Sequence, residues 1–141
     1  MIVSFAMFAD AANISQEGKL NILGVFDAVQ VGAMPAVHPR AHLVVRFKGT
    51  PMDVGIHKVA LRWINPAGVE LWSSDGQVEL TTPPPGVTEV DIPLIATIDL
   101  PLDVQGSYAM MVFVNDEPRG EVPLHVRTAA PFVAPAGGLV S

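Results

Sequence analysis

Apolar and polar residues alternate along most of the chain with a period of two, which predicts β-strands rather than helices. In the segment 41–47 every second residue is apolar, and polar residues occupy several of the positions between them. The segments 57–63, 90–98 and 121–127 repeat this alternation, and no stretch shows the spacing of an amphipathic helix. Strands with one apolar and one polar face are typical of antiparallel sheets that cover a core with one side.

Turn-forming residues separate the predicted strands. Gly18 and Gly68 each end a short polar stretch, where glycine supplies the positive φ of a tight turn. The run 83–86, Pro-Pro-Pro-Gly, is incompatible with helix and with strand pairing, so it predicts a crossing loop. Residues 115–120 are expected to join the last two strands.

The number and spacing of these segments predict the fold class. About eight short strands, with turns roughly every ten residues, indicate an all-β, immunoglobulin-like antiparallel β-sandwich over residues 1–128. The only tyrosine, Tyr108, opens the penultimate strand behind Gly106. This position is typical of a tyrosine corner, in which the phenol bonds to loop backbone and links the sheets. Residues 129–141 are mostly Ala, Pro and Gly and are expected to form an irregular tail.

Several short segments resemble a known family when they are taken together. They are Phe5–Asp10, Gly18–Asp27, Pro35–Arg40, Gly106–Tyr108 and Gly120–Leu124. The family consists of small bacterial proteins with only a domain-of-unknown-function label, and the resemblance spans about residues 3–127. It implies a compact sandwich of bacterial, cytoplasmic origin and supplies no activity, ligand or catalytic residue. Many relatives are expected to carry Cys where this chain has Ala9, so no thiol can act there.

Composition narrows the possible partners. The 141 residues include 8 Lys and Arg against 14 Asp and Glu, a net charge of −6, which argues against nucleic acid. The absence of Cys excludes disulfides, thiolate metal sites and thiol nucleophiles. The mean hydropathy of +0.40 suggests a membrane protein. However, the apolar run 1–9 is far shorter than the ~20 residues of a spanning helix, so no membrane insertion is expected.

The same apolar run could belong to a secretory signal, but its flanks argue against this. No Lys or Arg precedes Lys19, and Asp10 interrupts the run. We therefore interpret it as a first strand and expect a cytoplasmic protein, with secretion as the alternative.

The best polar cluster in the sequence surrounds a Pro-rich loop. Its members are Asp27, His38, Arg40 and His42, and Met34 flanks them. His38 and His42 have a spacing that suits a metal on a helix, but a strand follows here, so no metal is expected. In the ordinary interpretation His38 bonds to backbone and Arg40 pairs with Asp27 or Asp10. The alternative is a small-ligand site formed by the loop His38-Pro39-Arg40.

Catalytic motifs are missing from the sequence. It contains no Gly-x-Ser-x-Gly elbow, phosphate-binding loop or dinucleotide fingerprint. The segment Ser73–Gly76 is the nearest approach to a nucleophile site, and it is typical of a turn. Asp99 and Asp103 flank Pro101 in a predicted loop, where carboxylates are usually solvated. We expect neither enzymatic activity nor a cofactor, and a hydrolase-type enzyme is the least favoured hypothesis.

Opposite charges are concentrated in different parts of the chain. Five of the eight basic residues lie between positions 40 and 62, and ten of the fourteen acidic residues lie between positions 70 and 121. If these strands are separated in space, the molecule has a basic and an acidic face suited to head-to-tail association or to an acidic partner. If they are neighbours, the charges form cross-strand ion pairs, which is the slightly favoured alternative.

Two predicted strands, 20–31 and 108–114, are apolar on both faces, whereas a two-layer sandwich buries one face of each sheet. The tail, a bent or sheet-switching strand, or another protein could cover the second face. The candidate interface residues are Leu23, Val25, Val29, Val31, Met111, Phe113 and Phe132. The leading hypothesis is therefore a non-enzymatic protein that acts through protein–protein contacts, as a homo-oligomer or as a component of a larger assembly.

Overall fold

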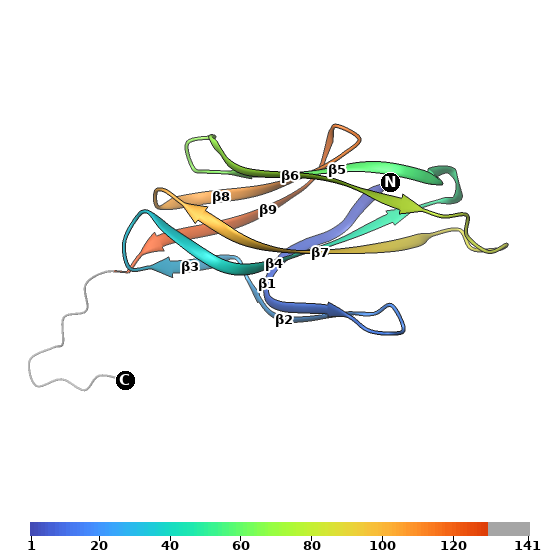
Figure 1. Ribbon diagram of the computed structural model, residues 1–141, viewed down its shortest axis with the longest axis horizontal. Coiled ribbons are helices and arrows are strands. Elements are labelled where there is room, and N and C mark those ends of the chain that lie inside the picture. The colour runs from blue at the N-terminus through green and yellow to red at the C-terminus, as the bar shows by residue number, and fades with distance from the viewer. Residues whose placement is uncertain (130–141) are drawn as a thin grey trace, which may run out of the picture.

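The computed structural model describes residues 1–129 as nine strands and one short 3-10 helix (Figure 1). The elements are β1 (Ile2–Ile14), β2 (Leu20–Phe26), β3 (Ala28–Val31), β4 (Ala36–Gly49), η1 (Pro51–Asp53), β5 (Gly55–Ile64), β6 (Glu70–Leu80), β7 (Val90–Leu102), β8 (Gly106–Val114) and β9 (Glu117–Thr128). Across this described part no helix is long and apolar enough to cross a membrane.

The strands form two sheets that pack face to face (Figure 1). The four-stranded sheet has the order β2-β1-β4-β7, and the five-stranded sheet has the order β3-β9-β8-β5-β6. The predicted immunoglobulin-like β-sandwich is confirmed, with nine strands instead of about eight. One pair, β3 and β9, is parallel, so the five-stranded sheet is mixed rather than wholly antiparallel.

The prediction of one strand over residues 20–31 is wrong. The chain changes sheets at Asp27: β2 pairs with β1, and β3 pairs with β9. The carbonyl of Asp27 accepts a hydrogen bond of 2.8 Å from the backbone N–H of His125, which begins the pairing with the second sheet. The expected sheet-switching strand therefore exists, and it turns Val29 and Val31 toward the core.

The connection between β8 and β9 is shorter than predicted. Only Asn115 and Asp116 form the turn, with φ values of 51° and 68°, and β9 begins at Glu117. Pro118 is tolerated inside the strand because β3 joins β9 only from His125 onward, so this part of β9 lies at the sheet edge. The predicted turn at Ser73–Gly76 is also wrong, because these residues pair with β5 inside β6.

Aromatic side chains fill the centre of the core. Trp63 is fully buried, stacks on Tyr108 with ring centroids 5.1 Å apart, and meets the edge of Phe8 at 5.8 Å. Its indole N–H donates to the carbonyl of Pro101 over 2.9 Å, which ties β5 to β7 in the other sheet. Such a buried tryptophan between the sheets is typical of immunoglobulin-like domains.

Tyr108 makes the contacts of a tyrosine corner. Its hydroxyl oxygen accepts hydrogen bonds from the backbone N–H groups of Asp103 (2.9 Å) and Val104 (3.0 Å). The same oxygen lies 2.8 Å from the Asp103 carboxylate, which also accepts from the Asn65 amide at 2.8 Å. Hydrogen bonds from Tyr108 and then from Asn65 lower the pKa of Asp103, while burial raises the pKa of Tyr108. These bonds lock the loop before β8 onto the core.

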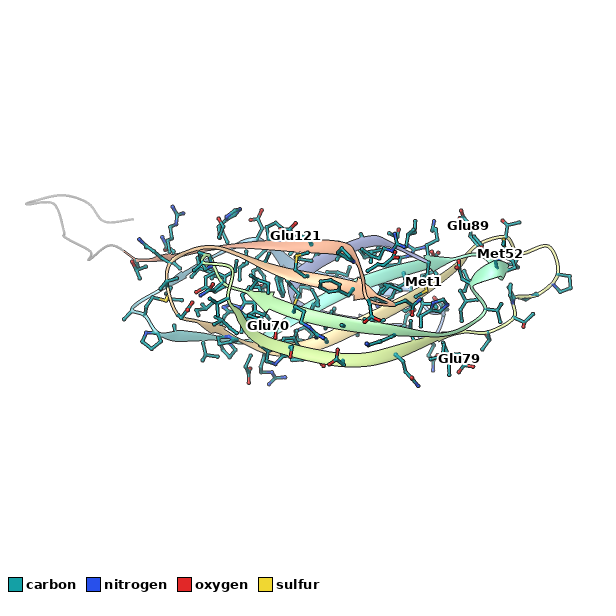
Figure 2. The ribbon with its side chains drawn as sticks, turned by 90° about the horizontal axis from the view of Figure 1, so that it is seen from above. Met1, Met52, Glu70, Glu79, Glu89 and Glu121 are labelled. Carbon is teal, nitrogen blue, oxygen red and sulfur yellow. The ribbon has the colours of Figure 1, made fainter. Side chains whose placement is uncertain are left out.

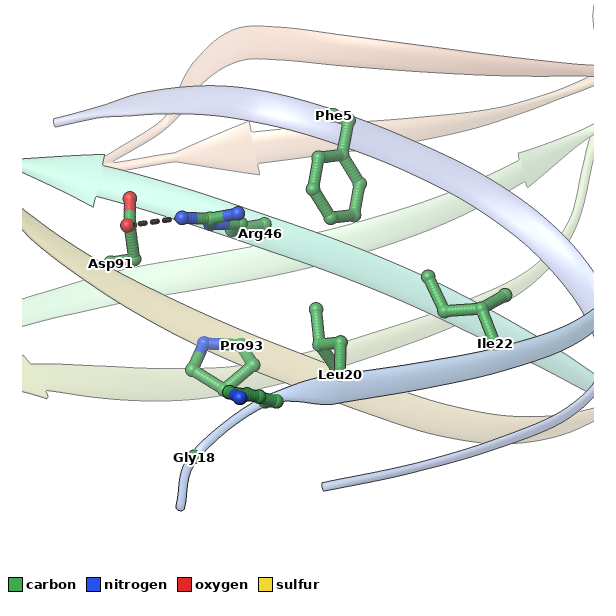
Figure 3. Close-up of a pocket in the computed structure, with 8 residues that line it drawn as sticks. Phe5, Gly18, Leu20, Ile22, Arg46, Asp91 and Pro93 are labelled. Atoms are coloured by element: carbon green, nitrogen blue, oxygen red, sulfur yellow. Dashed lines mark hydrogen bonds and ion pairs between the residues drawn. The ribbon is translucent and has the colours of Figure 1, made fainter. Parts of the chain in front are cut away.

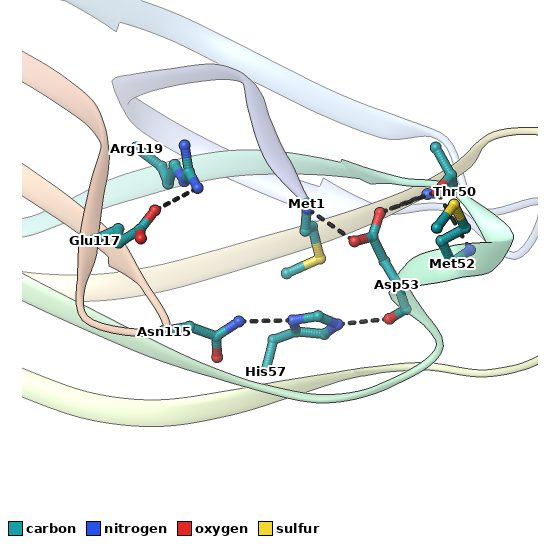
Figure 4. A network of polar contacts seen from close by, with 8 residues as sticks. All are labelled: Met1, Thr50, Met52, Asp53, His57, Asn115, Glu117 and Arg119. Carbon is teal, nitrogen blue, oxygen red and sulfur yellow. Dashed lines mark hydrogen bonds and ion pairs between the residues drawn. The ribbon is translucent and has the colours of Figure 1, made fainter.

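A second polar network lies near η1 (Figure 4). Asp53 accepts from the Thr50 backbone at 2.8 Å and from the Met1 amino group at 3.1 Å, and the Thr50 bond is the main reason that its pKa is lowered. The His57 Nε2–H donates to the Asp53 carbonyl (2.6 Å), and its Nδ1 accepts from the Asn115 amide (3.0 Å). The network joins the start of β1, the β4–β5 connection and the β8–β9 turn. Thr50 and Asp53 form a capping box at η1, and their Thr-x-x-Asp spacing is a signal that sequence reasoning missed.

Candidate functional site

The β1–β2 hairpin is the part of the molecule that leaves the sandwich (Figure 1). β1 pairs with β4 only as far as Ala9, and the remainder of β1 pairs with β2 alone. At this point Gly24 has a φ of 70°, and a Cβ there would lie 2.4 Å from the Asp10 carboxylate. Two-stranded ribbons twist more than wider sheets, so the hairpin turns away from the sheet plane. An isolated glycine in a strand pattern was the available sequence signal for this irregularity.

The hairpin crosses the outer face of the four-stranded sheet and encloses a hollow of about 410 Å³ (Figure 3). Its apolar lining consists of Phe5, Leu20, Ile22 and Pro93, and its polar lining includes Lys19, Arg46 and Asp91. The Arg46 guanidinium pairs with Asp91 and lies 5.8 Å from the centroid of the Phe5 ring. The hydrogen bond from Arg46 lowers the pKa of Asp91. The hairpin thus lies over part of the outer face of the four-stranded sheet.

The opposite side of the hairpin carries apolar side chains into solvent. Leu23 is 72% exposed and Val25 is 60% exposed, whereas Leu20, Ile22 and Phe26 are half-buried. The alternation along β2 therefore separates a side that packs on the molecule from a side that packs on nothing among residues 1–129. Exposed apolar pairs on one strand are a feature of interaction surfaces.

The terminal strands of the two sheets differ in how their edges are protected. Charged residues and proline discourage pairing with other chains at a sheet edge. β6 carries Glu70, Asp75 and Glu79, two of which are visible at the surface in Figure 2. β7 carries two prolines and two aspartates, and β3 is only four residues long. β2 has seven residues with neither charge nor proline, so among the four terminal strands of the described sheets it alone is neither charged, interrupted by proline nor very short.

The cluster predicted from the sequence is only partly brought together. The segment His38-Pro39-Arg40 lies inside β4, so the expected loop is wrong. A β-bulge occurs here: the four residues 38–41 of β4 lie opposite the three residues 98–100 of β7. His38 consequently packs on Phe26 with ring centroids 5.2 Å apart, and His42 lies on the other face of the strand.

The charged and apolar members of that cluster have separate environments. Arg40, with a φ of 52°, donates its backbone N–H to Asp99 at 2.9 Å. Neither Arg40 nor Asp27 forms a side-chain ion pair within residues 1–129, so the expected Arg40 pairing with Asp27 or Asp10 is not found there. Met34 packs against the core. A ligand site at these residues stays a prediction.

The candidate interface residues fall into four groups. Leu23 and Val25 are exposed, while Val29 and Val31 pack against the core because of the sheet switch. Met111 and Phe113 are half-buried on the outer face of the five-stranded sheet. Phe132 lies outside the described residues, as does the predicted tail beyond Ala129.

The basic and acidic strands are neighbours. Lys48 of β4 lies 3.4 Å from Glu89, and Arg46 pairs with Asp91 of β7. In the other sheet, Arg62 of β5 contacts the β6 residues Asp75 at 2.8 Å and Glu70 at 3.4 Å. Cross-strand ion pairs, rather than separate charged faces, account for these residues. Each pair at such an exposed position contributes about 0.2–1 kcal/mol.

Comparison with known proteins assigns this chain no activity. A model described as a family of unknown function, DUF6941, matches residues 4–127. A search of curated proteins finds no significant match. Among solved structures, an immunoglobulin-like protein from Pseudomonas aeruginosa is similar, with 14% sequence identity and a TM-score of 0.39. That similarity covers 89% of this chain and 94% of the other.

Proposed function

Because the chain belongs to the DUF6941 family of unknown function, which offers no activity to transfer, we propose from its structure that it acts by binding protein through the β1–β2 hairpin. The observation that carries this proposal is the edge strand β2, with seven uncharged residues and exposed Leu23 and Val25. An edge of this kind offers backbone hydrogen-bonding groups and apolar side chains to an extended segment of a partner.

The position of the hairpin supports the same proposal. Its inner side, with half-buried Leu20 and Ile22, faces the outer face of the four-stranded sheet across the hollow, so Leu23 and Val25 on the other side are directed into solvent. A preorganised strand loses less conformational entropy on binding than a mobile loop does. This hairpin therefore suits protein recognition better than an unsupported ribbon would.

Site-specific photocrosslinking tests the proposal. A benzophenone amino acid replaces Leu23 in the full chain, and the matched control places it at Glu79, an exposed residue of the protected edge β6. In cells of the native host we expect protein adducts from position 23 and few from position 79, identified by mass spectrometry. Equal labelling at both positions, or no adduct at position 23, contradicts the proposal.

The hollow beneath the hairpin supports a second candidate, the binding of a small ligand. Arg46 and Lys19 border an apolar floor together with one carboxylate, Asp91, and the resulting single net positive charge suits a carboxylate with an apolar body. Calorimetric titration with octanoate tests this function. Binding that is lost in Arg46→Gln and kept in Lys58→Gln, a cation on the other sheet, supports it, and no heat with the wild-type chain contradicts it.

A further inference from the structure

The backbone of β2 offers hydrogen-bonding groups on its outer edge in a fixed pattern. The N–H of Ser15 donates to the carbonyl of Lys19 over 2.8 Å, so this pair is hydrogen-bonded within the hairpin. Successive antiparallel pairs alternate between bonded and non-bonded, and the β1–β2 pairs on both sides of Asp10 and Gly24, from Ile14–Leu20 to Phe8–Phe26, keep the same register. The N–H and C=O groups of the even-numbered residues 20–26 therefore point away from β1, toward any added strand.

This pattern restricts how two copies of β2 could pair with each other. In an antiparallel pair related by a two-fold axis, even-numbered residues must face even-numbered residues for the outward groups to bond. The central residues of β2 thus give three registers, with Ile22, Leu23 or Gly24 on the axis. All three use the same backbone groups, so the side chains decide between them.

The charged residues that flank β2, Lys19 before it and Asp27 after it, select one register. With Leu23 on the axis, Lys19 lies opposite Asp27 of the second copy, and the same pair recurs at the other end. With Ile22 on the axis, Glu17 would lie opposite Asp27, which sets like charges against each other. With Gly24 on the axis, Lys19 would extend beyond Asp27, where the chain of the second copy leaves this sheet, and would gain no ionic partner. Only the Leu23-centred register is complementary at both ends.

The side chains needed for these contacts make few ionic interactions within one copy that the pairing would have to break. Lys19 is 3.8 Å from Glu17 in an exposed pair, and Asp27 has no ion pair among residues 1–129. On the axis, the two Leu23 side chains would meet each other, and each Val25 would lie beside Asn21 of the other copy. The pairing would cover the two exposed apolar side chains of the strand.

We propose that two copies of this chain associate through antiparallel β2–β2 pairing, with Leu23 on the two-fold axis and Lys19 opposite Asp27 at both ends. The two four-stranded sheets then join into one continuous sheet. This inference rests on the proposed function, because it names a second copy as the partner of the same edge.

Cysteine crosslinking reads the register directly, since the chain has no native Cys. At the axis, the two Leu23 Cα atoms form a non-hydrogen-bonded pair about 4.5 Å apart, a distance that a disulfide can bridge. Two copies of Val25 would be displaced by four residues, about 13 Å along the strands. Under mild oxidation Leu23→Cys should therefore give about tenfold more covalent dimer than Val25→Cys, its matched control on the same face.

Charge exchange provides a second measurement that does not depend on oxidation. Lys19→Glu alone and Asp27→Lys alone each place like charges opposite each other at both ends, so each should weaken self-association several-fold in sedimentation experiments. An equimolar mixture of the two variants restores both complementary pairs and should recover wild-type association as a heterodimer. Circular dichroism checks that each variant keeps the wild-type spectrum.

The outcomes separate this inference from the proposed function. Equal crosslinking of Leu23→Cys and Val25→Cys, or charge variants that associate as the wild type does, overturns the register. A strictly monomeric chain overturns self-pairing. In that case photoadducts of position 23 with a different protein would still support the proposed function. Their absence would contradict both the proposed function and the β2–β2 pairing.

Discussion

The tyrosine corner and the β1–β2 hairpin share a local backbone feature but differ in how far the rest of the molecule covers them. Each contains a glycine with positive φ against which another residue packs closely: a Cβ at Gly106 would lie 2.7 Å from Pro66, and a Cβ at Gly24 would lie 2.4 Å from Asp10. At the corner, the polar groups bond to one another and Tyr108 is buried. In the hairpin, the strand edge is unpaired within the described chain and Leu23 is exposed.

The difference follows from the number of elements that surround each region. Tyr108 lies between two sheets, so both its ring and its hydroxyl find partners inside the molecule. β1 leaves β4 after Ala9, and from there on β2 has β1 on one side and the outer face of the sheet beneath it. One edge and one face of β2 are therefore without a neighbour among residues 1–129. A closed region stabilises the fold, whereas a half-covered strand is available for a partner.

Trp63→Ala should have the largest effect, because it empties the centre of the closed region. Removal of a fully buried tryptophan costs about 3–5 kcal/mol in free energy of unfolding. Urea denaturation followed by circular dichroism measures the loss. Trp72→Ala, at the half-buried register partner on β6, is the control and should cost clearly less. Equal losses would show that the core is not centred on Trp63.

Tyr108→Phe keeps the ring and removes only the hydroxyl. Two backbone N–H groups and the Asp103 carboxylate lose a partner, which should cost about 1–3 kcal/mol in urea denaturation. Ser107→Ala, which removes an exposed hydroxyl that lies 2.9 Å from Nδ1 of His125, should cost clearly less, about 0.5 kcal/mol. A Tyr108→Phe loss as small as that of the control would contradict the locking role of the corner.

Asp103→Asn should flatten the acid side of the stability profile. The folded-state pKa of Asp103 is lowered, first by the Tyr108 hydrogen bond and then by that of Asn65. The carboxylate thus stabilises the fold above the unfolded pKa of about 4, and this stability is lost as pH falls through the lower, folded pKa. Urea midpoints at pH 7 and pH 3 should differ less in the variant than in the wild type. The same difference in both proteins would contradict a stabilising role of the Asp103 carboxylate in the corner network.

Leu23→Ser should have the smallest effect on the isolated chain. The side chain is 72% exposed, so the free energy of unfolding of a dilute sample should change by no more than about 0.5 kcal/mol. Self-association of concentrated samples should nevertheless fall. A large loss of stability in the dilute sample would show that Leu23 makes an intramolecular contact. It would contradict the comparison of an exposed hairpin with a closed tyrosine corner.

Much of the fold could be predicted from local alternation. In residues 41–47 the alternation of apolar and polar positions was sufficient to assign the buried side of the strand, because Ala41, Leu43, Val45 and Phe47 are all in the core. The sheet switch could not be predicted in its position, because Phe26 and Val29 are both apolar. Their assignment to different sheets depends on the bond between Asp27 and His125, far apart in the chain.

The candidate site was predictable only in part. Surplus apolar residues pointed to Leu23 and Val25 as well as to Val29 and Val31, and the sequence had no means of separating the two pairs. The hollow under the hairpin depends on Arg46, Asp91 and Leu20 meeting from three strands. No spacing along the chain encodes that meeting, because sheet order is set by long-range pairing.

The sequence by itself determined the strands, most of the turns and the residues of the core, since each depends on the period of two and on the backbone preferences of Gly and Pro. Only the tertiary structure decided which strands are neighbours. Because of this strand order, the basic and acidic residues form ion pairs, Val29 and Val31 pack against the core, and β2 lies at a sheet edge. The physical reason is that burial and pairing depend on every neighbouring element at once, whereas alternation records only which side of a strand prefers water.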